Sequence, residues 1–376
     1  MLGTVRTCGS TNNGSTTSGT CIRSGLKMRF TLCSLSAAAG ITAAVLMLAI
    51  LAAARPASAA DAYSVEHTWK IGGDGGWDYL TVDSPNHLLY IARGNRIQIV
   101  DVQTGKLVKE ITGLKGTHGV VFDSTGKQGY ISDGGDNAVR VFDRKTFELT
   151  GRIPTGQNPD GIVVEPATQR IFTFNGRSHD ATVIDVATNK VVGTIPLMGK
   201  PEFPVADGKG TVWVNNEDKS TIQKIDAKTM KVTGEWSIKP CEGPSGLAID
   251  KEHRRLFSVC DKVMAVSDAD AGKVVATVPI GDGPDADGYD AKNHIVFSSN
   301  GEGTLSIIEQ KSADEYTPLQ TLKTMRSART MALDSATGVA YLVGAQYGPP
   351  PAATPANPRP RPTIVPDTFV VLAVGK

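Results

Sequence analysis

The chain repeats one short pattern every 40 to 44 residues. Each copy is a small apolar run that ends in an acidic residue: Asp83, Asp123, Glu165, Asp207, Asp250, Asp290 and Asp334. A second run rich in Val and Ile, also ending in an acid, follows each of the first six: Asp101, Asp143, Asp185, Asp226, Asp268 and Glu309. A fixed period of this length is typical of a repeat architecture and argues against several unrelated domains.

Each unit contains four short β-strand patterns. Residues 159–200 show this in PDGIVVEPATQRIFTFNGRSHDATVIDVATNKVVGTIPLMGK, where Val, Ile, Phe and Thr alternate with turn residues. Apolar residues spaced three and four apart, which a helical solenoid would need, are absent. A four-stranded sheet of this size cannot bury its own faces, but seven arranged radially cover one another. The sequence therefore predicts an all-β protein, a seven-bladed β-propeller of four-stranded blades.

The last unit, from Ala328, provides three strands before the chain reaches Lys376. A fourth is available at the other end, because HTWKIGGDGGWD (67–78) is similar to TGRIPTGQNPDG (151–162). We therefore expect an N-terminal strand to close the last blade.

Four segments share a further pattern: YISDGGDNAVRVFD (130–143), IFTFNGRSHDATVID (171–185), VWVNNEDKSTIQKID (212–226) and VFSSNGEGTLSIIE (296–309). They resemble the repeat of the YVTN-type bacterial β-propeller family, in which an aromatic residue, Val and Asn precede a Val-x-Val-Ile-Asp run. The resemblance covers the chain that follows the N-terminal segment and implies the seven-bladed fold. Because the repeat residues are architectural, it implies no particular activity.

The N-terminal segment has the features of an export signal. Arg29 is followed by an apolar run from Ala37 to Ala54 and by the small-residue site Ala57-Ser58-Ala59. We expect a signal peptide at 28–59, an upstream extension at 1–27 that is not part of the fold, and a single propeller at 61–376, located in the periplasm or secreted. An uncleaved membrane anchor is the alternative for the apolar run; after cleavage we expect no stable membrane insertion.

Two cysteines, Cys241 and Cys260, remain after that segment. No C-x-x-C or C-x-x-C-H motif is present, so c-type haem, zinc-ribbon and thioredoxin-like sites lack support. In a propeller, both cysteines lie on connections that emerge on one face. In an exported protein this predicts a disulfide between them. A formal net charge of +1 provides no field that would attract nucleic acid.

Polar residues recur at the start of each predicted inner strand, five positions before the first acid of each unit. They are Asp78, His118, Asp160, Glu202, Ser245, Asp285 and Arg329. The residues one position before the acid are mostly apolar. We therefore expect the polar set, called here the mouth ring, to surround one end of the central channel.

Further candidate ligand-binding residues stand at fixed distances from the first acids of the units. Ten positions after them lie Asn175, Glu217 and Asn300, on loops expected to open toward the same face. Asp287 occupies a strand position that is apolar or Pro in the other units, and an inward carboxylate needs a partner. The Pro-rich stretch 346–367 lengthens the last blade's loop on this face, either as a pocket wall, as a ligand for a partner, or without a role.

These residues predict a binding or scaffold protein, monomeric and not an enzyme, that presents the mouth ring to a small molecule, a cation or a protein partner. The excess of acids favours a cation such as Ca²⁺, with Glu202 and Asp285 as ligands. The alternative is a metal-dependent hydrolase similar to the gluconolactonase-type propellers, with His118 as base. A polar rim is also what any channel mouth in contact with water requires. No G-x-S-x-G triad context and no H-E-x-x-H motif point to another chemistry.

Overall fold

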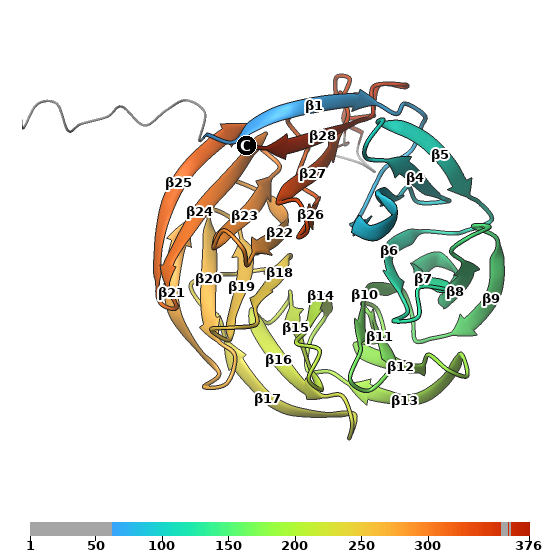
Figure 1. The fold of residues 1–376 in the computed structure, drawn as a ribbon, viewed down its shortest axis with the longest axis vertical. Coiled ribbons are helices and arrows are strands. Elements are labelled where there is room, and N and C mark those ends of the chain that lie inside the picture. Colours follow the sequence, from blue (N-terminus) through green and yellow to red (C-terminus); the bar gives the residue numbers. More distant parts are fainter. Residues whose placement is uncertain (1–61, 355–359, 361) are drawn as a thin grey trace, which may run out of the picture. The chain divides into compact units, whose positions relative to one another are not determined.

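The strands of the computed structural model form seven antiparallel sheets of four strands, arranged in a ring (Figure 1). The model describes residues 62–354, 360 and 362–376. The seven-bladed propeller predicted from the repeat is confirmed. The expected extension at 1–27 and signal peptide at 28–59 lie outside the described residues.

In the first six blades the strand order follows the sequence from the channel outward. The first two blades are β2 (Leu80–Asp83), β3 (Leu88–Ala92), β4 (Ile97–Asp101), β5 (Lys106–Ile111), and β6 (Thr117–Phe122), β7 (Gln128–Asp133), β8 (Ala138–Asp143), β9 (Leu149–Pro154). The third and fourth are β10 (Pro159–Glu165), β11 (Arg170–Asn175), β12 (Asp180–Asp185), β13 (Lys190–Pro196), and β14 (Pro201–Ala206), β15 (Thr211–Asn216), β16 (Thr221–Asp226), β17 (Lys231–Ser237). The fifth and sixth are β18 (Leu247–Asp250), β19 (Arg255–Cys260), β20 (Val263–Asp268), β21 (Lys273–Pro279), and β22 (Pro284–Asp290), β23 (Ile295–Asn300), β24 (Thr304–Ser312), β25 (Glu315–Lys323).

The seventh blade is built from both ends of the described chain. Its inner strands are β26 (Met331–Asp334), β27 (Val339–Gly344) and β28 (Val370–Gly375), and its outer strand is β1 (Ser64–Lys70). β1 pairs antiparallel with β28, from Ser64 opposite Gly375 to Lys70 opposite Val370. Figure 1 shows the blue β1 beside the dark red β28. The predicted closure by an N-terminal strand is confirmed.

Each of the seven blade interfaces holds one apolar cluster among the described residues. Between the third and fourth blades, for example, Phe172 and Phe174 pack with Val212 and Val214, all without solvent exposure. A blade therefore buries both of its faces, one against each neighbour. This explains why its middle strands are nearly continuous runs of apolar residues.

The repeated acids serve the framework. The second acid of a unit closes the turn after the third strand, as Asp185 does by accepting hydrogen bonds from the backbone N–H and hydroxyl of Thr188. In five of the seven units the first acid also links neighbouring blades: Asp83, Glu165, Asp207, Asp250 and Asp334. Glu165 accepts a hydrogen bond from the backbone N–H of Gly210 in the fourth blade. Their recurrence is thus explained without any ligand.

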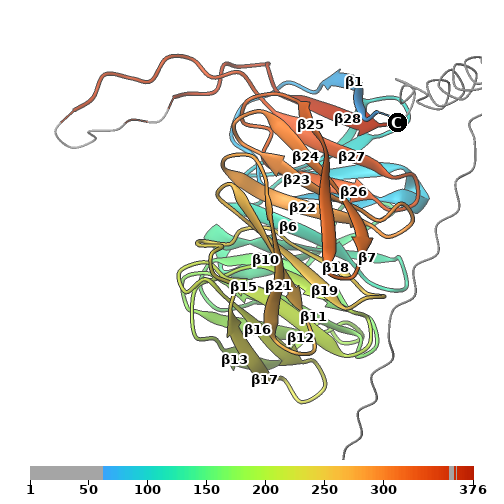
Figure 2. The ribbon, with the colours of Figure 1, turned by 90° about the vertical axis from the view of Figure 1, so that its left-hand side faces the viewer.

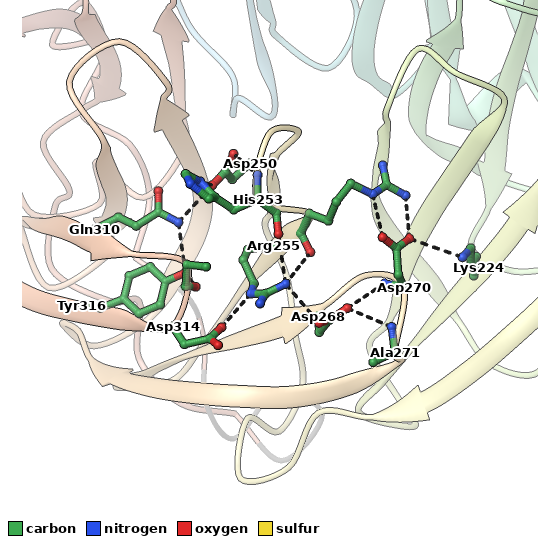
Figure 3. A network of polar contacts seen from close by, with 12 residues as sticks. Lys224, Asp250, His253, Arg255, Asp268, Asp270, Ala271, Gln310, Asp314 and Tyr316 are labelled. Atoms are coloured by element: carbon green, nitrogen blue, oxygen red, sulfur yellow. Dashed lines mark hydrogen bonds and ion pairs between the residues drawn. The ribbon is translucent and has the colours of Figure 1, made fainter.

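The fifth blade is tied to both neighbours by a polar network (Figure 3). On one side, Lys224 of β16 forms an ion pair with Asp270 at 3.8 Å. On the other, Gln310 of β24 donates a hydrogen bond to Asp250 at 3.0 Å, and Arg255 forms an ion pair with Asp314 at 2.8 Å.

Helical structure in the described part of the chain is limited to two short 3₁₀ turns, η2 (Ser84–Asn86) and η3 (Gly134–Asp136). Neither has the length or the apolar character that a membrane-spanning helix requires.

Candidate functional site

Six members of the mouth ring contact one another along two arcs. In the first, His118 Nδ1 lies 2.6 Å from Asp78 Oδ2 and 3.4 Å from Asp160 Oδ1. In the second, the Ser245 hydroxyl donates to Asp285 Oδ1 at 3.0 Å, and Arg329 lies 3.5 Å from Asp285 Oδ2. Glu202 stands between the two arcs. The spacing of these residues thus brings them to one place, while their binding role stays a prediction.

The first arc is an imidazole held between two carboxylates from neighbouring blades. Burial opposes the charge of His118, but the hydrogen bond to Asp78 and the charge of Asp160 outweigh it and raise the pKa of His118 to about 9. Burial raises the pKa of Asp160 to about 6, against the attraction of His118. Near neutral pH the imidazole of His118 is therefore protonated and donates to Asp78.

Glu202 is bound across the channel, by a blade that is not its neighbour. The hydroxyl of Tyr79, in the first blade, donates to Glu202 Oε1 of the fourth blade at 3.1 Å. The Tyr79 ring also meets Phe203 edge-on, with 4.9 Å between ring centroids. These two aromatic rings therefore meet next to the mouth ring. The mouth ring and these two rings are together called the cup, with the two rings as its floor.

The second oxygen of Glu202 is poorly compensated. Oε2 is buried and accepts no hydrogen bond from the described residues, and Lys200 Nζ lies 3.6 Å away. Lys200 also contacts Glu217. Burial, followed by repulsion from Asp160, raises the pKa of Glu202 to about 8. A cation entering the cup would relieve this unfavourable arrangement.

On the second arc, burial raises the pKa of Asp285, and the charge of Arg329 partly offsets this. Behind Ser245, Cys241 and Cys260 form a disulfide with a Cα–Cα distance of 5.3 Å. Both cysteines are buried. The predicted disulfide is confirmed, and it fixes the connection that leads into the fifth blade.

Two residues predicted from their offset do not face the cup. Asn175 is buried and donates to Asp180 and Thr182 of its own blade, and Asn300 donates in the same way to Thr304 and Ser306. Both side chains thus connect the second strand of their blade to the start of the third.

Glu217 lies one residue beyond the equivalent position. β11 ends at Asn175 and β23 ends at Asn300, whereas β15 ends at Asn216. β15 begins four positions after Asp207, whereas β11 begins five positions after Glu165, so counting ten positions from the acid passes the end of β15. Asn216 donates to Thr221 in the framework role, and Glu217 binds Lys200 at the rim of the cup.

Asp287 lies in the wall of the channel on β22. A Cβ placed on Gly246 of the fifth blade would come within 2.7 Å of Asp287 Oδ1, so the carboxylate is wedged between two blades. Both oxygens are inaccessible and find no well-aligned donor among the described residues. Burial raises the pKa of Asp287 well above its usual range, although the backbone amides of Asp287 and Ala248 favour the charge. The partner expected from the sequence is therefore missing.

One group of side chains in the described part of the chain has the types and spacing of metal ligands. Asp78, His118 and Asp160 each offer one atom, and these three atoms lie within 4.8 Å of one another. The predicted pair, Glu202 and Asp285, belongs to no such group, since each is held by the partners given above. Calcium binding by that pair stays a prediction.

A hollow of about 820 Å³ lies at the base of the Pro-rich loop and has a different character. Met325, Ser327 and Tyr347 line it together with Pro350 and Pro362. The base of the Pro-rich loop is held by backbone hydrogen bonds between Gly348 and Thr363 and between Val365 and Gln346. Figure 2 shows the described part of this loop before residue 355 extending away from the blades. The loop therefore forms one wall of a hollow, but that hollow contains none of the ring carboxylates.

The fold and the cup define a seven-bladed β-propeller with an acidic channel mouth. No family model matches the chain, and no curated protein matches it. Among solved structures it is similar to Kuenenia stuttgartiensis hydrazine synthase, with a TM-score of 0.65 and 15% sequence identity over 74% of this chain and 95% of that one. At this identity the similarity shows the fold alone.

Proposed function

We propose that this chain is an exported β-propeller that binds a cation at its channel mouth. The cup and its rim carry five carboxylates, Asp78, Asp160, Glu202, Glu217 and Asp285, against the cationic groups of His118, Lys200 and Arg329. The observation that carries the proposal is Glu202, whose buried Oε2 lacks a hydrogen-bond donor among the described residues. A buried carboxylate with so few hydrogen-bond donors is costly to ionise, and a bound positive charge offsets that cost.

We further propose that the chain is a monomeric member of the YVTN-type family and is located in the periplasm or secreted. The repeat, the closed ring and the buried disulfide support this. Binding is favoured over hydrolysis because His118, the expected base, is engaged by both Asp78 and Asp160. A protein partner would fit the cup by presenting a lysine or arginine side chain.

Thermal unfolding of the chelator-treated protein tests the proposal. Divalent chlorides, choline and spermidine are compared with neutral sugars and with phosphate. We expect stabilisation by at least one cation, and none by sugars or phosphate. The double variant Asp160→Asn, Glu202→Gln should lose the effect, whereas Asp136→Asn, on a neighbouring loop, should keep it. Equal stabilisation of the wild type and the double variant would refute the proposal.

A further inference from the structure

We infer that the cation is a first-row divalent transition ion of the Zn²⁺ class, bound by Asp78, His118 and Asp160. This inference rests on the proposed function and names its ligand. It differs from the calcium site expected at Glu202 and Asp285 in both the ion and the residues.

The distances match such an ion. Zinc bonds to nitrogen and carboxylate oxygen are about 2.0–2.1 Å long, so two ligands at a tetrahedral angle lie about 3.3 Å apart. His118 Nδ1 and Asp160 Oδ1 are already 3.4 Å apart. The 2.6 Å between His118 and Asp78 is a hydrogen-bond distance, which lengthens when an ion replaces the proton. Little movement is therefore needed to form the site.

The framework holds the three ligands in place. They come from the inner-strand entries of three consecutive blades, so no single flexible loop carries the site. A Cβ placed on Gly134 would lie 2.7 Å from His118 Nε2, so the imidazole packs tightly against that backbone. The ring is thereby oriented with Nδ1 toward the carboxylates.

The donor types select the ion. Calcium and magnesium prefer oxygen ligands alone, whereas an imidazole nitrogen with carboxylates suits zinc and its neighbours in the first row. The buried Oε2 of Glu202 is an independent observation, because it is an acceptor without a donor beside Asp160. It can accept a hydrogen bond from water on the ion. Zinc can therefore use the imidazole nitrogen of His118 as well as the carboxylate oxygens, whereas calcium would use the oxygens alone.

Equilibrium dialysis of the chelator-treated full chain against ZnCl₂, with and without excess CaCl₂, tests the inference. We expect the wild type to bind one Zn²⁺ more than His118→Asn, which can retain a donor to Asp78 but lacks the imidazole. Asp160→Asn should weaken zinc binding by about 10- to 100-fold or more, and Gly134→Ala should weaken it by displacing the ring. Excess calcium should not compete.

The matched control is His179→Asn, which removes an exposed imidazole from a loop where Asn tolerates the left-handed backbone, with φ of 54°. Any zinc on Cys8, Cys21 or Cys33, outside the described residues, is present in every variant and cancels in the comparison. Circular dichroism confirms that each variant folds, and visible absorption of bound Co²⁺ reports the ligand geometry.

The outcomes separate the two proposals. Equal zinc binding by the wild type, His118→Asn and Asp160→Asn overturns the inference. Calcium or choline binding that depends on Glu202, without zinc binding that depends on His118, overturns it too but leaves cation binding intact. Absence of any cation binding removes both.

Discussion

Tyr79 and Glu202 join the first and fourth blades by a hydrogen bond of 3.1 Å across the channel. Most contacts between inner strands link neighbouring blades. This hydrogen bond instead links two blades that are not neighbours, which strand pairing does not do. It also couples the floor of the cup to the carboxylate that we propose attracts the cation.

A double-mutant cycle measures this coupling. Tyr79→Phe should destabilise the protein by about 1–3 kcal/mol, because it leaves a buried carboxylate without its donor. Above about pH 8, where Glu202 is ionised, the same substitution should cost less in a Glu202→Gln background, since a neutral amide oxygen is a weaker acceptor than a carboxylate. Urea unfolding of the four proteins gives the coupling free energy. A value near zero would mean that the two groups act independently.

Asp287 should make stability depend on pH. Its pKa is raised in the folded protein, so the folded state keeps a proton that the unfolded state releases above about pH 4. Stability should therefore fall as pH rises from there toward the folded-state pKa. Asp287→Asn removes this loss and should be more stable than the wild type by about 1–3 kcal/mol at pH 7, and about equal near pH 3. Urea unfolding across this range checks it, and a difference independent of pH would contradict the assignment.

The disulfide should stabilise the fifth blade. Its cysteines are 19 positions apart, and closing a loop of that size contributes about 3 kcal/mol in the chain-entropy model. The double variant Cys241→Ala, Cys260→Ala should lose about this amount of unfolding free energy. Reductant should lower the stability of the wild type but not of the variant. Mass spectrometry of the unreduced protein should find a peptide linked through both cysteines, and two alkylatable thiols would exclude the bond.

The closing strand can be tested through a pair of glycines. Gly105 has φ of 68°, and a Cβ added there would overlap the ring of Trp69 on β1. Gly113 has φ of 81° and open space around it. Both changes to Ala carry a similar backbone cost, so Gly105→Ala should cost about 1–3 kcal/mol more than Gly113→Ala. Equal melting temperatures would show that the contact between Trp69 and the first blade contributes nothing.

The repeat predicted the blades, their closure and the mouth ring, because strand period and turn position are local properties. It did not predict which offset residues face the cup. Asn175 and Asn300 turn inward because Thr182 and Ser306 accept their amide hydrogens, which depends on pairs within each blade. The shift from Asn216 to Glu217 arose because β15 begins one position sooner after its acid than β11 does.

The sequence does indicate the contact between Tyr79 and Phe203, but a comparison of polar residues alone does not detect it. Four positions before the first acids, Tyr79 and Phe203 align with small residues in the other units: Gly119, Gly161, Gly246, Ala286 and Thr330. A Cβ on Gly119, Gly161 or Gly246 would collide with the neighbouring blade, so these positions accept no ring. Recognising this requires placing the first and fourth units opposite each other, which only a closed ring provides.

The seventh blade has a consequence for biogenesis. During synthesis the first six blades can form one after another, each soon after its fourth strand emerges. β1 is made before all of them, yet its partner β28 ends at Gly375. Ring closure must therefore wait until β28 has left the ribosome. Until then β1 has no strand to pair with. A chain that travels unfolded and completes its fold only at its destination meets this requirement.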